Sequence, residues 1–163
     1  MGTKATTMKV ELLQTFITGH PVIDAEHAKI VDSINGVSEA VSAGDYDQCA
    51  ILLEDFLTIC IEHFAHEERE LEALGYPGLQ DHIVFHKELV IKAKAVKCLC
   101  MDMGSPDSIQ RCFDEMVTLL IEDVVKGDMQ FVSFLIEQGI VEGRDHHLPI
   151  AKHPIPGDPN KTS

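Results

Sequence analysis

Residues 45–75 read DYDQCAILLEDFLTICIEHFAHEERELEALG, and this stretch decides the fold. Its apolar residues recur every three or four positions, the spacing that places side chains on one face of an α-helix. Asp45 and Gln48 form a capping-box pattern at its start, and Gly75 with Pro77 ends it. The stretch therefore predicts one long amphipathic helix. Its buried face would carry Leu52, Phe56, Ile59, Cys60, His63, Glu67, Leu71 and Leu74.

Three other segments show the same periodicity. One precedes this stretch and ends at Gly44, one runs from about Gly78 to Met103, and one opens at Ser105-Pro106 and ends at Gly139. Because the links between them are short, neighbouring helices must run antiparallel. The sequence therefore predicts an all-α, up-down-up-down antiparallel four-helix bundle over residues 21–139. An N-terminal arm (residues 1–20) and a flexible C-terminal tail (residues 140–163) would flank it.

Composition narrows the classes of function. The 163 residues carry a formal net charge of −14, which disfavours binding to nucleic acid or to anionic membranes. No apolar run is long enough to span a membrane and no signal-peptide pattern is present, so we expect a soluble, cytoplasmic protein. The polar outer faces suit a monomer or a weak oligomer. The five cysteines lack zinc-site spacing, and we expect reduced thiols.

Polar residues interrupt the apolar faces of all four predicted helices. A single histidine on such a face is usually a hydrogen-bonded core residue, and a single carboxylate usually reaches solvent. Several of them in one dry interior would each need a partner, and inward-facing Arg or Lys is scarce. Divalent metal satisfies them all at once, so we predict a metal site. Its ligands would be His27, His63, Glu67, His82, His86 and Asp128.

The ligand types indicate which metal is bound. Imidazole and carboxylate without thiolate suit iron, manganese or zinc. Six ligands exceed what one tetrahedral zinc ion uses, so two bridged ions fit better. Iron is the common occupant of such bundle cores.

The motifs resemble those of bacterial hemerythrins. They are TGHPVIDAEH (residues 18–27), HFAHEE (residues 63–68), Tyr76-Pro77 and His82-x-x-x-His86, and the resemblance covers about residues 16–138. It implies a pair of iron ions joined by an oxo or hydroxo group and bridged by Glu67 and Asp128. One iron would be held by His27 and His63 and keep an open position for dioxygen. The other would take His82, His86 and one ligand from the fourth helix.

The fourth helix departs from the family pattern, which has a histidine five residues before the aspartate. Asp123 stands at that position. Asp123 is either a seventh ligand or a residue that points to solvent. As a ligand it makes the donor set harder, which favours ferric iron. If it points to solvent, water fills the position. On a straight helix Asp123 and Asp128 would lie roughly 140° apart. A π-bulge near Gly127 would bring them to one side.

Three functions remain open at this point. The first is dioxygen binding for sensing, delivery or storage, and a sensor would need a separate signalling partner. The second is a di-iron peroxidase or oxidase, a nitric oxide enzyme or a redox sensor acting on peroxide or nitric oxide, which Asp123 favours. The third is iron handling. His20 near the site, or a tail histidine (His146, His147 or His153), is a less favoured extra donor.

Overall fold

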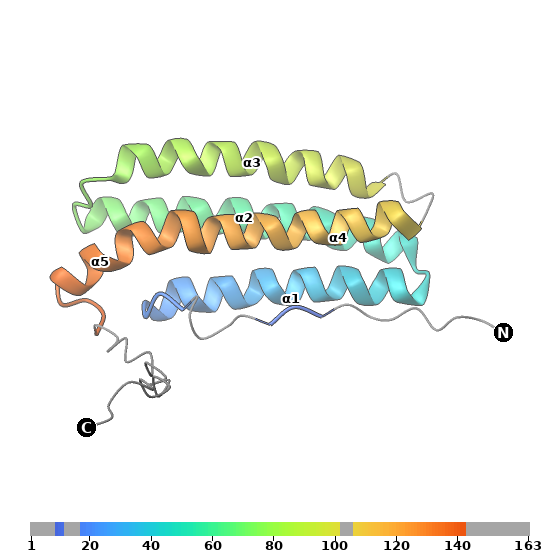
Figure 1. Ribbon diagram of the computed structural model, residues 1–163, viewed down its shortest axis with the longest axis horizontal. Helices are drawn as coiled ribbons and strands as arrows, with labels where there is room; N and C mark the ends of the chain where they lie inside the picture. Colours follow the sequence, from blue (N-terminus) through green and yellow to red (C-terminus); the bar gives the residue numbers. More distant parts are fainter. Residues whose placement is uncertain (1–8, 12–16, 102–105, 143–163) are drawn as a thin grey trace, which may run out of the picture.

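The computed structural model describes residues 9–11, 17–101 and 106–142. Figure 1 shows the helical rods side by side with nearly parallel axes. Consecutive rods contact each other, and α4 also contacts α1, which closes the bundle. The predicted all-α bundle with antiparallel neighbours is therefore confirmed. Its elements are α1 (Pro21–Ala43), α2 (Tyr46–Ala73), α3 (Leu79–Met101), α4 (Pro106–Ile121), the π-helix η2 (Glu122–Asp128) and α5 (Met129–Glu137).

The link between α1 and α2 shows why the chain reverses where the sequence predicts. Gly44 has φ +72°, a left-handed conformation that favours glycine, and its N–H donates to the Val41 carbonyl at 3.0 Å. Asp45 then accepts a hydrogen bond from the backbone N–H of Gln48 at 3.0 Å. This bond satisfies an N–H that the first turn of α2 would otherwise leave unpaired.

The fourth rod contains the predicted irregularity. The chain forms a π-helix from Glu122 to Asp128 between α4 and α5. Because a π-helix follows i→i+5 geometry, it brings Asp123 and Asp128 to one side of the rod. Both side chains are buried, at 2% and 0% exposed. The alternative that Asp123 points to solvent is therefore wrong.

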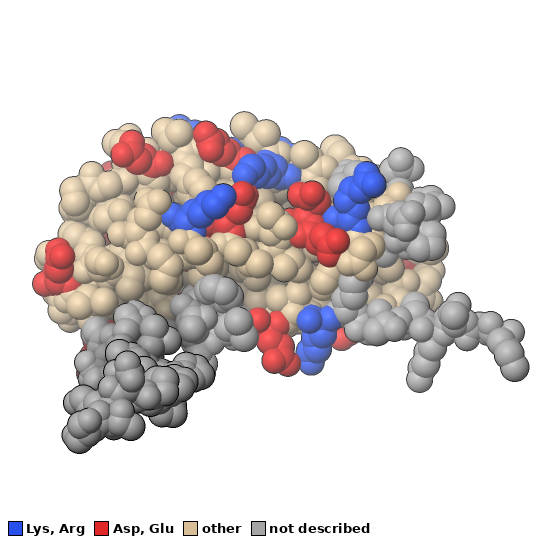
Figure 2. Space-filling view, in the orientation of Figure 1, with Lys and Arg blue, Asp and Glu red and all other residues tan. Residues whose placement is uncertain are grey.

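Ion pairs on the outer surface tie η2 to α3. Glu122 accepts from Lys92 of α3 at 2.6 Å and from Lys126 at 3.1 Å. On the face seen in Figure 2, basic side chains lie beside acidic ones in the same way. Such exposed pairs contribute little to stability. The buried contacts of η2 contribute more to stability.

Gly127 of η2 packs closely against α3. A Cβ on Gly127 would lie 2.8 Å from Phe85 Cε1 and 3.5 Å from His82 Cε1. We therefore expect Gly127→Ala to lower the free energy of unfolding by about 1–3 kcal/mol, because overpacking outweighs the helix propensity of alanine. Gly36→Ala in α1 is the matched control, since its Cβ would meet Leu52 at an ordinary 3.7 Å. It should stabilise the protein by about 0.5–1 kcal/mol. Urea unfolding measures both, and equal effects would contradict the close packing of η2.

The core has two parts. The larger cluster fills one end of the bundle around Phe56, Leu89 and Met116. The smaller one lies around Phe131 and Leu135 of α5 and is formed by Ile23, Leu71, Phe131, Leu135 and Val141.

A disulfide joins Cys100 of α3 to Cys112 of α4. The expectation that all thiols are reduced is wrong for this pair. Its two Cα atoms lie 5.1 Å apart, within bridging range, and only the packing of α3 on α4 sets that distance. Cys49 and Cys60 are free and buried, and Cys98 is free and exposed.

The predicted arm and tail are only partly described. Val10 exchanges two hydrogen bonds with the Asn35 side chain of α1, at 2.7 and 2.9 Å. Val141 is buried against Gly19. The tail histidines lie outside the described residues. Within the described ranges, no helix is both long enough and apolar enough to cross a membrane.

Candidate metal centre

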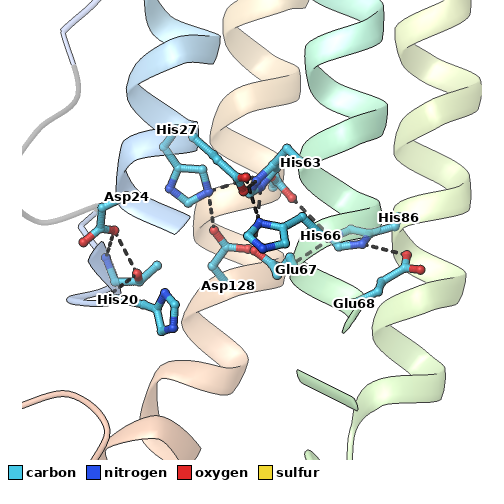
Figure 3. A network of polar contacts seen from close by, with 12 residues as sticks. His20, Asp24, His27, His63, His66, Glu67, Glu68, His86 and Asp128 are labelled. Carbon is cyan, nitrogen blue, oxygen red and sulfur yellow. Dashed lines mark hydrogen bonds and ion pairs between the residues drawn. The ribbon is translucent and has the colours of Figure 1, made fainter. Parts of the chain in front are cut away.

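All seven predicted ligands lie together inside the bundle (Figure 3 shows most of them). α1 contributes one, α2 and α3 contribute a pair each with i, i+4 spacing, and η2 contributes two. Each is 3% exposed or less, because each projects from the face that its helix turns to the core. Their ligand atoms fall into two groups, in each of which the atoms lie within 4.8 Å of one another. The groups are His27, His63, Asp123 and Asp128, and Glu67, His82 and His86.

The first group gathers side chains from three rods. His27 Nε2 lies 2.8 Å from Asp128 Oδ2 and 3.9 Å from Asp123 Oδ2. His63 Nε2 lies 3.2 Å from the same Asp123 oxygen. Two imidazoles and two carboxylates thus face a common point, an arrangement that suits a divalent cation.

The second group is built around Glu67. Its Oε1 lies 2.5 Å from His82 Nε2 and 3.4 Å from His86 Nε2. Its other oxygen, Oε2, lies 3.7 Å from His63 Nε2 in the first group. One carboxylate therefore faces both groups, as a ligand shared by two metal ions would.

Many of these donor atoms lack a hydrogen-bond partner. Buried polar atoms are normally satisfied, and an unsatisfied one costs about 1–3 kcal/mol. The His27–Asp128 contact is short, yet neither atom has hydrogen-bond geometry there. Metal ions would satisfy these lone pairs, so the donor set fits a metal pair. The unpaired site atoms are His27 Nε2, Glu67 Oε2, His86 Nε2, Asp123 Oδ1, and Asp128 Oδ1 and Oδ2.

Comparison with known proteins also indicates a cation-binding domain. A family model described as "Hemerythrin HHE cation binding domain" matches residues 18–129. The chain belongs to the hemerythrin family. The match includes α1, α2, α3, α4 and η2 and ends at the first residue of α5, so it contains all seven buried donors.

Curated hemerythrins are distant relatives. "Bacteriohemerythrin" from Pseudomonas aeruginosa is 35% identical over 75 residues, 46% of this chain and 48% of the relative. The chain thus spans about half the length of that relative. "Bacteriohemerythrin" from Clostridium acetobutylicum is 25% identical over 121 residues, 72% of this chain and 94% of the relative. "Myohemerythrin" from Riftia pachyptila is 29% identical over 82 residues, 50% of this chain and 63% of the relative.

Two carboxylates outside the two ligand groups orient His63 and His86 of this hemerythrin, and neither was predicted from the sequence. His63 donates its Nδ1–H to Glu26 Oε2 at 3.0 Å, and His86 donates its Nδ1–H to Glu68 Oε1 at 3.0 Å. Each bond fixes the ring and leaves Nε2 to face the site. The signal was present in the sequence, since Glu26 adjoins His27 and Glu68 adjoins Glu67.

Two further histidines lie near the site but outside both groups. His66 donates to Glu26 at 2.8 Å and has a side chain 28% exposed. His20 precedes α1, and its backbone N–H donates to Thr18 Oγ1 at 3.1 Å. Asp24 accepts from Thr18 and Gly19, which holds this turn against the start of α1 (Figure 3).

Without metal, protonated imidazoles balance the carboxylates. Burial disfavours the charged form of His63, but hydrogen bonds to Asp123 and Glu26 outweigh it and raise its pKa to about 10. Burial likewise opposes the charge on His86, but Asp123 and Glu67 raise its pKa to about 9. Burial also opposes the charge on Asp123, yet these two histidines lower its pKa. Burial and the nearby Glu67 raise the pKa of Asp128.

Metal binding should therefore release protons. His63 and His86 are protonated at neutral pH in the metal-free protein, and a metal ion binds only neutral imidazole. We expect apparent affinity to rise about tenfold per pH unit for each proton released, until pH passes the two pKa values. Calorimetry at pH 7 in buffers of different ionisation enthalpy counts these protons. Their absence at pH 7 would contradict the raised pKa values.

The same shifts set the pH dependence of the metal-free fold. Both histidines have folded-state pKa values above their unfolded value of about 6.5. Their contribution to stability is therefore complete below that pH. It is lost as pH rises through about 9 for His86 and about 10 for His63.

Proposed function

We propose that this hemerythrin holds two iron ions and binds dioxygen. One iron would be bound by His27 and His63, and the other by His82 and His86. Glu67 and Asp128 would be shared, and Asp123 would add a further carboxylate. The observation that supports this proposal is the presence of two adjacent groups of buried donors with one Glu67 oxygen facing each.

The surroundings of the site support a small apolar ligand. The Phe64 ring stacks on His86 with 4.4 Å between centroids, and Phe131 meets His82 edge-on at 5.5 Å. Both phenylalanines are buried, as is Phe56. These rings exclude water and hold the imidazoles in place. A bound ferrous pair would supply the electrons that make dioxygen binding possible.

A second candidate function is redox sensing or chemistry on peroxide or nitric oxide. The burial of Asp123 beside His63 favours it, because a third carboxylate stabilises ferric over ferrous iron.

Anaerobic loading with ferrous iron tests both candidates. Bound iron is counted, and the absorption spectrum is then followed through repeated cycles of oxygen and vacuum. Two irons per chain with charge-transfer bands that appear and disappear would support dioxygen binding. Two irons that oxidise once and stay ferric would favour the second candidate. Fewer than two tightly bound irons would contradict the proposal.

A further inference from the structure

The helix α3 carries apolar side chains on two opposite faces. Its inner face holds Leu89 and Ala93 in the core, while Val84 and Ile91 on its outer face are 55% and 69% exposed. Ile91 is the most exposed large apolar side chain among the described residues. α3 lies along one edge of the bundle and packs on α2, α4 and η2 (Figure 1). Within the described part of the chain, its outer face is therefore uncovered.

The exposed side chains of this outer α3 face are spaced for contact with another helix. Val84, Ile91 and Cys98 recur every seven residues, so they form one line along α3. Lys87 and Lys94 repeat at the same interval beside that line. A seven-residue repeat of apolar side chains flanked by charged ones is the pattern through which two helices pack along their length. The spacing therefore favours a helix as the occupant of this face.

The charge of α3 is opposite to that of the whole protein. α3 contains four lysines and two acidic residues, whereas the chain has a formal net charge of −14. Lys92 and Lys97, at the sides of the helix, form ion pairs with neighbouring rods. Lys87 and Lys94 form no ion pair with any described residue. Two exposed lysines without a partner favour an occupant that supplies carboxylates.

A second copy of this chain fits the outer α3 face poorly. Two copies packed through α3 would bring faces of the same positive charge together, including Lys87 and Lys94 of each copy. Like charges that face each other across a contact destabilise it. The lysines therefore disfavour a homodimer and favour a partner of opposite charge.

We propose that the outer α3 face docks an acidic, amphipathic helix of another protein. The apolar side of that helix covers Val84 and Ile91. Its carboxylates pair with Lys87 and Lys94. Because the opposite side of α3 carries two histidines of the candidate metal centre, the docked helix lies about one helix diameter, roughly 10 Å, from it. The inference needs no bound metal, so its failure would leave the proposed function untouched.

A synthetic helical peptide of about three heptads, with a leucine seam flanked by glutamates, is the probe. Fluorescence anisotropy measures its binding to the full chain near physiological ionic strength, where distant charges are screened. Lys87→Glu with Lys94→Glu should weaken binding about tenfold, because two exposed ion pairs become two repulsions. Lys29→Glu with Arg69→Glu is the matched control, since these exposed residues of α1 and α2 give the same change of net charge. It should alter the affinity less than about twofold.

The apolar line is tested separately. Ile91→Asp should weaken binding of the same peptide by more than about tenfold, because the apolar contact is lost. Ile51→Asp is the control, since Ile51 is 56% exposed on α2 and should leave binding unchanged.

Three results would overturn the inference. The first is no binding of the peptide to the wild type at about 1 mM. The second is an equal loss of affinity in the α3 variants and in their controls. The third is a wild-type dimer in sedimentation that Ile91→Asp dissociates, because a second copy would then occupy this face.

Discussion

Asp123→His should convert the metal pair into one that binds dioxygen more reversibly. The change removes one buried negative charge, and Asp123 Oδ2 lies 3.2 Å from His63 Nε2 at the centre of the site. A unit charge at about 4 Å is worth about 4 kcal/mol at an effective dielectric constant near 20. We therefore expect the ferric–ferrous reduction potential to rise by on the order of 100 mV. Spectroelectrochemistry measures the potential, and oxygen–vacuum cycling measures reversibility.

Asp114→His is the control for that experiment. Asp114 lies on α4, is exposed, and accepts a hydrogen bond from Gln110. The same change of charge there is screened by solvent, so the potential should stay within experimental error of the wild type. A shift of equal size in both variants, or an unchanged potential in Asp123→His, would show that Asp123 does not tune the metals.

Glu67→Gln should remove most of the metal binding. Glu67 is 0% exposed, and its two oxygens face His82 and His63 respectively. An amide cannot supply a charged oxygen to both metals. Loss of an outer hydrogen-bond partner already costs 10–100-fold in metal affinity, so we expect a loss above about 100-fold here. Metal analysis after gel filtration and competition with a chelator measure it.

Glu62→Gln provides the matched control, because Glu62 is an exposed residue of the same helix. It should bind metal as the wild type does. Circular dichroism of each metal-free variant separates lost affinity from lost fold. In the holo protein, Glu67→Gln should also lower the melting temperature, because bound metal stabilises the folded state by mass action. Two tightly held metals in this variant would show that Glu67 is not shared.

The sequence predicts the bundle because each of its helices has local start and stop signals. Asp45 and Gly44 determine the first reversal by their own backbone geometry, without help from distant residues. The buried face of α2 follows from the 3.6-residue period, which also places His63 and Glu67 side by side. The π-helix was predictable because two aspartates five residues apart cannot share one face of a straight helix.

Contacts between helices were harder to predict. The link between Cys100 and Cys112 depends on the packing of α3 against α4. The direction of Asp123 depends on the separation of His63 and His86, which lie on different helices. Ile121 has a large apolar side chain on the fourth helix but is 45% exposed. It lies at the edge of the apolar stripe, and Met116 and Leu120 fill the core there instead.

The π-helix also marks the place of one extra residue in this part of the chain. A π-turn holds one more residue than the α-turn it replaces, so loss of one residue within 124–127 would restore an ordinary helix. α4 and α5 would keep their core-facing sides, and Asp123 and Asp128, then four apart, would still share one face. A single codon deletion is thus a route by which a lineage could remove the irregularity yet keep both carboxylates turned to the core.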